Sequence, residues 1–328
     1  MVIPSVTALP LSSTPASAPP RTNHHAHCSH GPEGDIQPDW GAKGHGLIQE
    51  VAVETLPQDT VPDFFTDSKD RLVGLATQPD RWKPKQLGYL RGATALDHFM
   101  AYEQVKGIEL PADRYDFLSK VQSEGLSVPG AAPKYVGFLP YRVAEMYQNL
   151  TLDFAIWRNE GEKLGADDPR RKALEENVLT SAGLLGHYVE DAAMPLHSSV
   201  HHDGWNEAAV GGNPKGFRTR RGLHREFETD LVNAKAQEEE VRERVAPARQ
   251  FKGDPLQWGL GIVAESNVQV DKLYTLEKNG ELKASNPSAE AVDFMHDRMA
   301  VGAQNLRDFW YTAWVESEGL AKDIFRPE

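Results

Sequence analysis

Apolar residues recur at steps of three and four positions through most of the chain from residue 40 onward. The clearest case is the stretch 139–164, where Val143, Met146, Leu150 and Phe154 follow this spacing. Such a period is typical of an amphipathic helix with one buried face. No stretch alternates apolar and polar residues as a half-buried strand would. The pattern therefore predicts an all-α fold.

Eight segments carry the helical period. They are 47–56, 63–75, 97–105, 139–164, 170–193, 223–232, 256–277 and 289–320. Pro57 ends the first segment because proline cannot continue a helix, and Asn286-Pro287-Ser288 offers a cap for the last. Loops rich in Gly, Pro and Asn are predicted at 123–136 and 198–222. We predict one large helical domain over residues 40–328.

Residues 1–39 have a different composition. Met1 to Pro20 are rich in Ser, Thr, Ala and Pro, which is typical of disordered segments, and four histidines cluster within 24–30. The start lacks the basic region and the apolar core of a signal peptide. We interpret 1–39 as a disordered leader or tail, with a His-rich end that binds metal incidentally.

Composition and charge narrow the possible functions. The chain has 328 residues and a net charge of -13, which argues against neutralising the phosphates of duplex nucleic acid. No apolar run approaches the roughly 20 residues that a transmembrane helix needs. The only cysteine is Cys28, so the chain forms no internal disulfide and has no Cys-rich metal site. Histidines and carboxylates must hold any zinc, and no stable protein partner is evident.

The stretch 186–197, Gly-His-Tyr-Val-Glu-Asp-Ala-Ala-Met-Pro-Leu-His, carries the strongest chemical signal. His187 and Asp191 are four residues apart, so their side chains share one helical face. Pro195 ends the helix, and His197 follows at once. Two imidazoles and a carboxylate form a typical zinc ligand set. The motif therefore predicts a metal site at the end of this helix.

A second pair with the same spacing, His224 and Glu228, lies downstream. One such pair alone is weak support, because histidine and acid residues four apart also occur as ordinary surface pairs. Two pairs with a histidine between them favour a metal centre. We interpret His201 and His202 as solvent-facing and His296 as an ordinary helix residue without a role in the site.

Together with other motifs, these residues resemble the superfamily of zinc-dependent phospholipases C and single-strand nucleases, in particular a bacterial-like member of the nuclease P-one and S-one type. The matching motifs follow the family's order over about residues 40–230: Trp40-Gly41-Ala42-Lys43-Gly44-His45, Pro79-Asp80 with Lys83, Asp97-His98-Phe99, the block from His187 to His197, Gly211-Gly212-Asn213, and His224 with Glu228. The resemblance implies an all-helical phosphodiesterase built around three zinc ions.

The resemblance also implies which residues hold each ion. The first ion would be held by Asp80, His98, His187 and Asp191. The second would be held by His197, His224 and Glu228. The third would be held by His45, the far oxygen of Asp191, and the free amino group and carbonyl of Trp40.

Three side chains would take part in the reaction: Asp80, Lys83 and Asp191. Zinc lowers the pKa of bound water from 15.7 to about 7, so a hydroxide beside Asp191 would be available to attack phosphorus. Lys83 would stabilise charge on the phosphoryl oxygens. A solvated lysine is the alternative interpretation of Lys83.

Two positions depart from the family pattern. In the family the mature chain begins at the tryptophan, whose amino group binds metal, whereas here Asp39 precedes Trp40. The third ion is therefore expected only if the preceding segment is removed. The nuclease branch often has a base-reading carboxylate three residues after the equivalent of His98, and here that residue is Ala101. Phe99 could still stack on a base, and Asn213 is the second predicted substrate contact.

The motifs divide between the two branches of the superfamily. The spacing of Trp40 and His45 and the loop Gly211-Gly212-Asn213 favour the nuclease branch, whereas Glu228 in place of aspartate favours the phospholipase branch. The main prediction is an endonuclease acting on single-stranded DNA or RNA. The alternatives are a phospholipase C acting on phosphoglyceride head groups and a non-catalytic, zinc-binding helical protein. The resemblance further implies a secreted or periplasmic location.

Overall fold

The computed structural model describes residues 41–57 and 60–325. Within this part of the chain every regular element is an α-, 3-10 or π-helix, and β pairing is confined to an isolated bridge between His202 and Gly204. The predicted all-α, single-domain fold is therefore confirmed. The prediction for residues 1–39, including the histidine cluster, lies outside the described residues.

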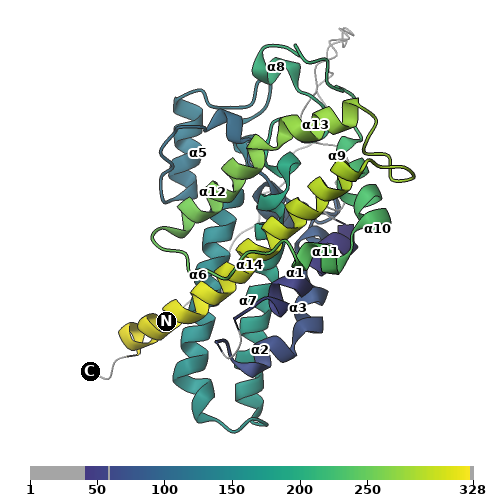
Figure 1. Cartoon of the computed structure of the whole chain (residues 1–328). Helices are drawn as coiled ribbons and strands as arrows, with labels where there is room; N and C mark the ends of the chain where they lie inside the picture. Colours follow the sequence, from purple (N-terminus) through teal and green to yellow (C-terminus); the bar gives the residue numbers. More distant parts are fainter. Residues whose placement is uncertain (1–40, 58–59, 326–328) are drawn as a thin grey trace, which may run out of the picture.

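Three long helices form the centre of the domain: α6 (Leu139–Glu160), α7 (Pro169–Ala193) and α14 (Ala289–Ile324). Helices α6 and α7 run side by side, and α14 crosses both of them (Figure 1). Helix α1 (Gly41–Glu54) packs against α14 and α7, and α12 (Pro255–Val268) packs against α6. The C-terminal half of α7, which holds the central motif, is thus surrounded by other helices.

Two features of α7 fix its position. Its first turn is capped by Asp168, whose side chain accepts a hydrogen bond from the Arg170 amide, and Pro169 occupies the first helical position. Further along, Gly186 leaves room for the Gln49 side chain of α1, which donates to the Gly183 carbonyl at 3.0 Å. This bond joins α1 to α7 one helical turn beyond His45.

The remaining elements are short. They are α2 (Asp63–Asp67), α3 (Lys69–Leu75), η1 (Pro79–Trp82), α4 (Gly88–Thr94), η2 (Ala95–His98), η3 (Tyr102–Gln104), α5 (Arg114–Ser123), η4 (Pro133–Val136), η5 (Gly161–Lys163), η6 (Pro195–Ser198), α8 (Glu207–Val210), α9 (Leu223–Arg225), the π-helix η7 (Glu226–Leu231), α10 (Val232–Lys235), α11 (Glu238–Arg242) and α13 (Val270–Lys278). The segments expected at 63–75 and 256–277 each form two helices, with breaks at Ser68 and Gln269.

The prediction of one helix over residues 97–105 is wrong. Residue Phe99 is extended, with φ -152° and ψ 166°, and it separates η2 from η3. The backbone amides that a helix would use internally bind elsewhere: Met100 donates to the carbonyl of His197 at 2.8 Å, and Ala101 donates to that of Val136 at 2.7 Å. These bonds attach the His98 segment to the turn that carries His197.

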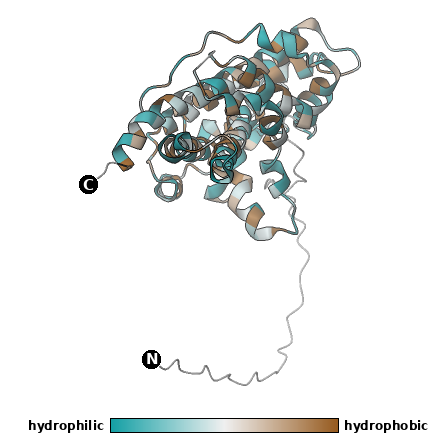
Figure 2. Cartoon of the chain, turned by 90° about the horizontal axis from the view of Figure 1, so that it is seen from below, coloured by the Kyte–Doolittle hydropathy of each residue, from teal (hydrophilic) through white to brown (hydrophobic). Residues whose placement is uncertain are grey.

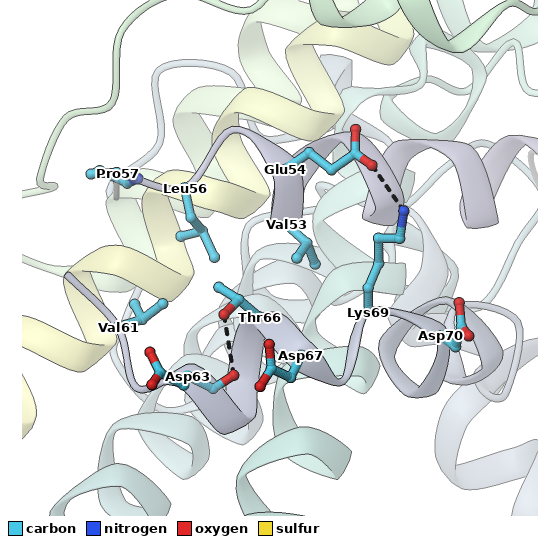
Figure 3. Close-up of a pocket in the computed structure, with 10 residues that line it drawn as sticks. All are labelled: Val53, Glu54, Leu56, Pro57, Val61, Asp63, Thr66, Asp67, Lys69 and Asp70. Carbon is cyan, nitrogen blue, oxygen red and sulfur yellow. Dashed lines mark hydrogen bonds and ion pairs between the residues drawn. The ribbon is translucent and has the colours of Figure 1, made fainter. Parts of the chain in front are cut away.

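Hydrophilic and hydrophobic residues alternate along the same helices (Figure 2). In the described part of the chain, no helix is long and apolar enough to cross a membrane. A hollow of about 670 Å³ lies between the end of α1 and helices α2 and α3. Its lining includes Glu54, Asp63 and Lys69, and Lys69 donates to Glu54 at 2.8 Å (Figure 3). None of the predicted metal ligands lines this hollow.

Candidate metal centre

The first predicted ligand group comes from three elements that converge on one point. Helix α7 supplies His187 and Asp191, η1 supplies Asp80 and η2 supplies His98. Nε2 of His187 lies 3.0 Å from Nδ1 of His98. The same Nε2 lies 3.3 Å from Asp191 Oδ2 and 3.5 Å from Asp80 Oδ1. Because all four side chains direct nitrogen or oxygen atoms at a common centre, they form one candidate site.

These separations match those of ligand atoms around a metal ion. Zinc ligands at roughly 2.0–2.1 Å in tetrahedral geometry lie about 3.3 Å from one another. In addition, Asp191 Oδ1 accepts no hydrogen bond from the described residues although Asp191 is fully buried. A buried carboxylate oxygen without a donor is costly, and a cation would remove that cost. Two imidazoles and two carboxylates therefore fit a zinc ion.

The second predicted group lies beside the first. His197 follows α7 on η6, His224 lies on α9, and Glu228 lies on the π-helix η7. Nε2 of His197 is 3.2 Å from Nε2 of His224 and 3.4 Å from Oε1 of Glu228. Nε2 of His224 is 2.6 Å from Oε2 of Glu228. Short π-helical segments are frequent at functional sites, and this one carries a candidate ligand.

The far nitrogens of three of these histidines contact backbone carbonyls. Nδ1 of His187 is 2.8 Å from the carbonyl oxygen of Ala76, and Nδ1 of His224 is 2.8 Å from that of His202. Nδ1 of His197 contacts the carbonyl oxygen of His98. A ring that donates from Nδ1 keeps its lone pair on Nε2, and this arrangement is usual for histidines that bind metal. In each ring, Nε2 is the atom that faces the ligand group.

His45 lies on the other side of Asp191. Its Nε2 is 3.8 Å from Asp191 Oδ1, and its ring stacks on that of His187 with centroids 4.3 Å apart. With His187 and Asp191 it forms a third group that could hold an ion. The remaining predicted ligand, Trp40, lies outside the described residues, so the complete third set stays a prediction.

Glu190 is a residue of the site that the sequence analysis did not identify. It is fully buried, and its carboxylate contacts Nδ1 of His45. Burial, followed by the charge of Asp191, raises the pKa of Glu190 well above its usual value. The available signal was a second carboxylate directly before Asp191, in the same helical turn as His187. Glu190 thus orients His45 so that Nε2 faces Asp191.

Burial and charge set the protonation of the ligands. Burial, helped by the nearby Lys83, lowers the pKa of His98 to about 3, so its ring is neutral at pH 7. Burial alone would raise the pKa of Asp191, but His187 and His197 outweigh it and hold that pKa well below its usual value. A neutral imidazole and an ionised carboxylate are the forms that bind metal.

Lys83 lies next to the first group. Its side chain is 6% exposed, and Nζ is 2.5 Å from Oδ1 of Asp80. The interpretation of a solvated lysine is therefore wrong. Its predicted contact with phosphoryl oxygens stays a prediction, and the position beside Asp80 is compatible with it.

The two predicted substrate contacts lie in different surroundings. Phe99 is half-buried, and its carbonyl accepts a hydrogen bond from the Leu139 amide at 3.2 Å. The side-chain amide of Asn213 both donates to the Phe217 carbonyl and accepts from the Phe217 amide, each at 2.8 Å. These two hydrogen bonds therefore tie Asn213 to Phe217 within the same loop. Substrate binding by either residue remains a prediction.

Three other histidines lie outside the ligand groups. His202 is exposed, as expected, but His201 is buried: its ring stacks on Trp205 with centroids 3.6 Å apart, and its Nδ1 accepts from the Asn206 amide at 2.9 Å. The solvent-facing prediction for His201 is wrong because the 198–222 loop folds over its own aromatic cluster. His296 is also buried, and Nε2 accepts from the Gln237 amide at 3.2 Å.

A further group of carboxylates, Glu50, Glu54 and Glu238, lies apart from these histidines. Lys69 donates to Glu50 and Glu54, each at 2.8 Å, and Arg242 contacts Glu54 and Glu238. The two cations balance much of the negative charge. This group is therefore an ordinary surface network of ion pairs.

Comparisons with known proteins give a weak structural likeness. No protein-family model and no curated protein matches the chain. Among solved structures, the alpha toxin from Clostridium absonum is 13% identical, with a TM-score of 0.39 over 86% of this chain and 66% of the toxin. The alpha-toxin of Clostridium perfringens from avian strain SWCP is 10% identical, with a TM-score of 0.37 over 90% of this chain and 66% of the toxin.

The matched part of this chain thus spans just under two thirds of the length of each toxin. Likeness at this level assigns no activity.

Proposed function

We propose that the protein is a zinc-dependent phosphodiesterase of the phospholipase C class. The observation that carries the proposal is the position of Asp191 between two ligand groups. Its Oδ2 lies 2.9 Å from Nδ1 of His98 in the first group, and its Oδ1 lies 3.8 Å from Nε2 of His45 in the third. One carboxylate therefore links histidines that would hold neighbouring ions. Sites with adjacent metal ions are a common means of phosphoester hydrolysis.

Zinc ions in these groups would supply hydroxide at neutral pH and positive charge for the phosphoryl oxygens. The chain itself contributes charged side chains around the ions and holds them in fixed positions. Asp191 is held ionised by the histidines around it, and Lys83 brings a cation to the edge of the first group. Because both side chains are almost fully buried, their charges act in a medium of low dielectric constant, where they are most effective.

A phospholipid substrate is better supported than a nucleic acid. The position at which the resemblance would place a base-reading carboxylate is Ala101, which is 2% exposed. The side-chain amide of Asn213 is held by two hydrogen bonds to Phe217 of its own loop. Glu228, the ligand typical of the phospholipase branch, is fully buried against His224. We therefore place the endonuclease prediction second to the phospholipase alternative.

A direct comparison of substrates tests this proposal. The zinc-loaded protein would be offered a soluble chromogenic phosphodiester, phosphatidylcholine and single-stranded DNA in parallel. We expect hydrolysis of the soluble diester and of phosphatidylcholine, with release of phosphocholine, and much slower cleavage of DNA. Faster cleavage of DNA would restore the endonuclease prediction. Stoichiometric zinc without turnover of any of the three substrates would favour the non-catalytic alternative.

A further inference from the structure

The chain between two candidate ligands, Asp80 and His98, contains the most exposed apolar surface near the metal centre. All seven residues from 84 to 90 are exposed. They include Leu87 at 49%, Tyr89 at 100% and Leu90 at 39% exposed. Large apolar side chains clustered on a short exposed segment commonly mark an interaction surface.

The same segment is strongly basic. Between Asp80 and Asp97 the chain has four cations and no acidic residue. Lys83 is buried and paired with Asp80, which leaves Arg81, Lys85 and Arg91 to give the segment its positive charge. The whole chain, in contrast, has a net charge of -13. A local positive charge on an acidic protein is suited to a partner that bears phosphate groups.

The exposed residues are attached to the metal centre through their own element. Helix α4 packs against both η1 and η2, which carry Asp80 and His98. Arg91 donates from Nη1 to the carbonyl oxygen of Lys83 at 2.6 Å, and Nζ of Lys83 lies 2.5 Å from Asp80. A surface bound by α4 would therefore lie directly beside the candidate ligands.

We propose that residues 81–91 form a docking segment for a phospholipid surface. Leu87, Tyr89 and Leu90 enter the boundary between head groups and acyl chains, and Arg81 and Lys85, the exposed cations of the segment, lie against lipid phosphates. Tyrosine is suited to such a boundary because its ring is apolar and its hydroxyl is polar. The two leucines offer no face for base stacking, so this chemistry favours lipid over single-stranded nucleic acid. As an account of how substrate reaches the site, the proposal rests on the proposed function.

Vesicle binding tests the docking segment separately from catalysis. The full chain, treated with chelator so that no lipid is hydrolysed, would be sedimented with vesicles of phosphatidylcholine containing phosphatidylglycerol. The triple variant Leu87→Ser, Tyr89→Ser, Leu90→Ser is expected to bind about tenfold more weakly or worse, since it removes the apolar area that enters the lipid. The control is Val268→Ser at the end of α12, which is also exposed, at 73%, and should bind as the unchanged protein does.

A second variant tests the charge of the segment. Arg81→Glu with Lys85→Glu is expected to weaken binding to these vesicles about fivefold for each cation removed, and the loss should shrink at high salt. Circular dichroism of all variants checks that the helices are retained. If the unchanged protein does not bind the vesicles, or the triple variant binds as well as the Val268→Ser control, the docking proposal is overturned.

Two further outcomes separate the docking proposal from the proposed function. The triple variant should hydrolyse the soluble diester at the normal rate after zinc is restored, while hydrolysis of vesicles falls. If the protein cleaves no phosphodiester but still requires the segment for vesicle binding, the proposed function fails and the docking segment stands. If the variant loses binding to single-stranded DNA and keeps binding to vesicles, the partner is nucleic acid and the lipid proposal is wrong.

Discussion

The two ligand groups of the centre are built in different ways. The group around His187 and Asp191 draws on elements spread from α1 to α7, and its side chains are between 0% and 10% exposed. In the group of His197, His224 and Glu228, two of the three ligands lie on adjoining helical turns, and His224 is 14% exposed. The first group therefore depends on the packing of the whole domain, whereas the second is more local and more open. Damage to the first should be the more severe.

The largest effect is expected from Asp191→Asn. Asp191 belongs to the first ligand group and also faces His45 of the third, so loss of its charge should reduce turnover at least about a thousandfold and lower the bound zinc by at least one ion. Helix content should be almost unchanged, because asparagine has nearly the same shape. Kinetics with a soluble phosphodiester, elemental analysis and circular dichroism measure the three quantities. Normal turnover in this variant would place the centre elsewhere.

A smaller effect is expected from Glu228→Gln. The change weakens the group of His197 and His224 and leaves the His187 group intact, so the protein should lose about one zinc ion and about a hundredfold in turnover. Measuring the zinc content of the Glu228→Gln and Asp191→Asn variants in parallel compares the two ligand groups directly. Loss of both zinc ions from the Glu228→Gln variant would mean that the groups do not bind independently.

Acidification provides a third test. Burial lowers the pKa of His187, but Asp191 and Asp80 outweigh burial, so that its pKa lies above the usual 6.5. A proton on this ring competes with metal, and zinc uptake by the metal-free protein should weaken as the pH falls through the pKa of His187. His98, with a pKa of about 3, should not contribute in this range. Titration calorimetry with zinc at several pH values measures the trend, and uptake that is independent of pH between 5 and 8 would contradict it.

The smallest functional effect is expected from His296→Ala. His296 is buried, accepts a hydrogen bond from the Gln237 amide and belongs to none of the ligand groups. Its loss should cost about 1–3 kcal/mol of unfolding free energy and leave turnover and zinc content unchanged. Thermal unfolding and the soluble-substrate assay check both parts. A loss of turnover comparable to that of Asp191→Asn would show that the site is wrongly placed.

The sequence predicted the helical fold and the pairs His187 with Asp191 and His224 with Glu228 for a physical reason, whereas Asp80, His98 and His45 were expected only from the family resemblance. Pairs such as His187 with Asp191 are set by the period of one helix, so their proximity can be read from spacing alone. The spacing of apolar residues along α6, α7 and α14 can likewise be recognised within each helix alone. These features needed no knowledge of tertiary contacts.

The errors arose where tertiary contacts override local pattern. The apolar residues near 97–105 have helical spacing, but their backbone amides bond to the His197 turn and to Val136. Glu190 was not identified because its partner, His45, is 145 residues away in sequence. His201 was misplaced because the loop that holds it packs on Trp205. In each case the deciding contact comes from outside the local helical pattern.

The central claim is that these buried histidines and carboxylates hold zinc, and metal content tests it most directly. The protein would be purified without chelator and analysed for zinc per chain, beside the Asp191→Asn variant. We predict two ions per chain, rising towards three when the chain begins at Trp40, with a clear loss in the variant. A protein that contains no zinc under these conditions, and takes up none when zinc is added, would contradict the account.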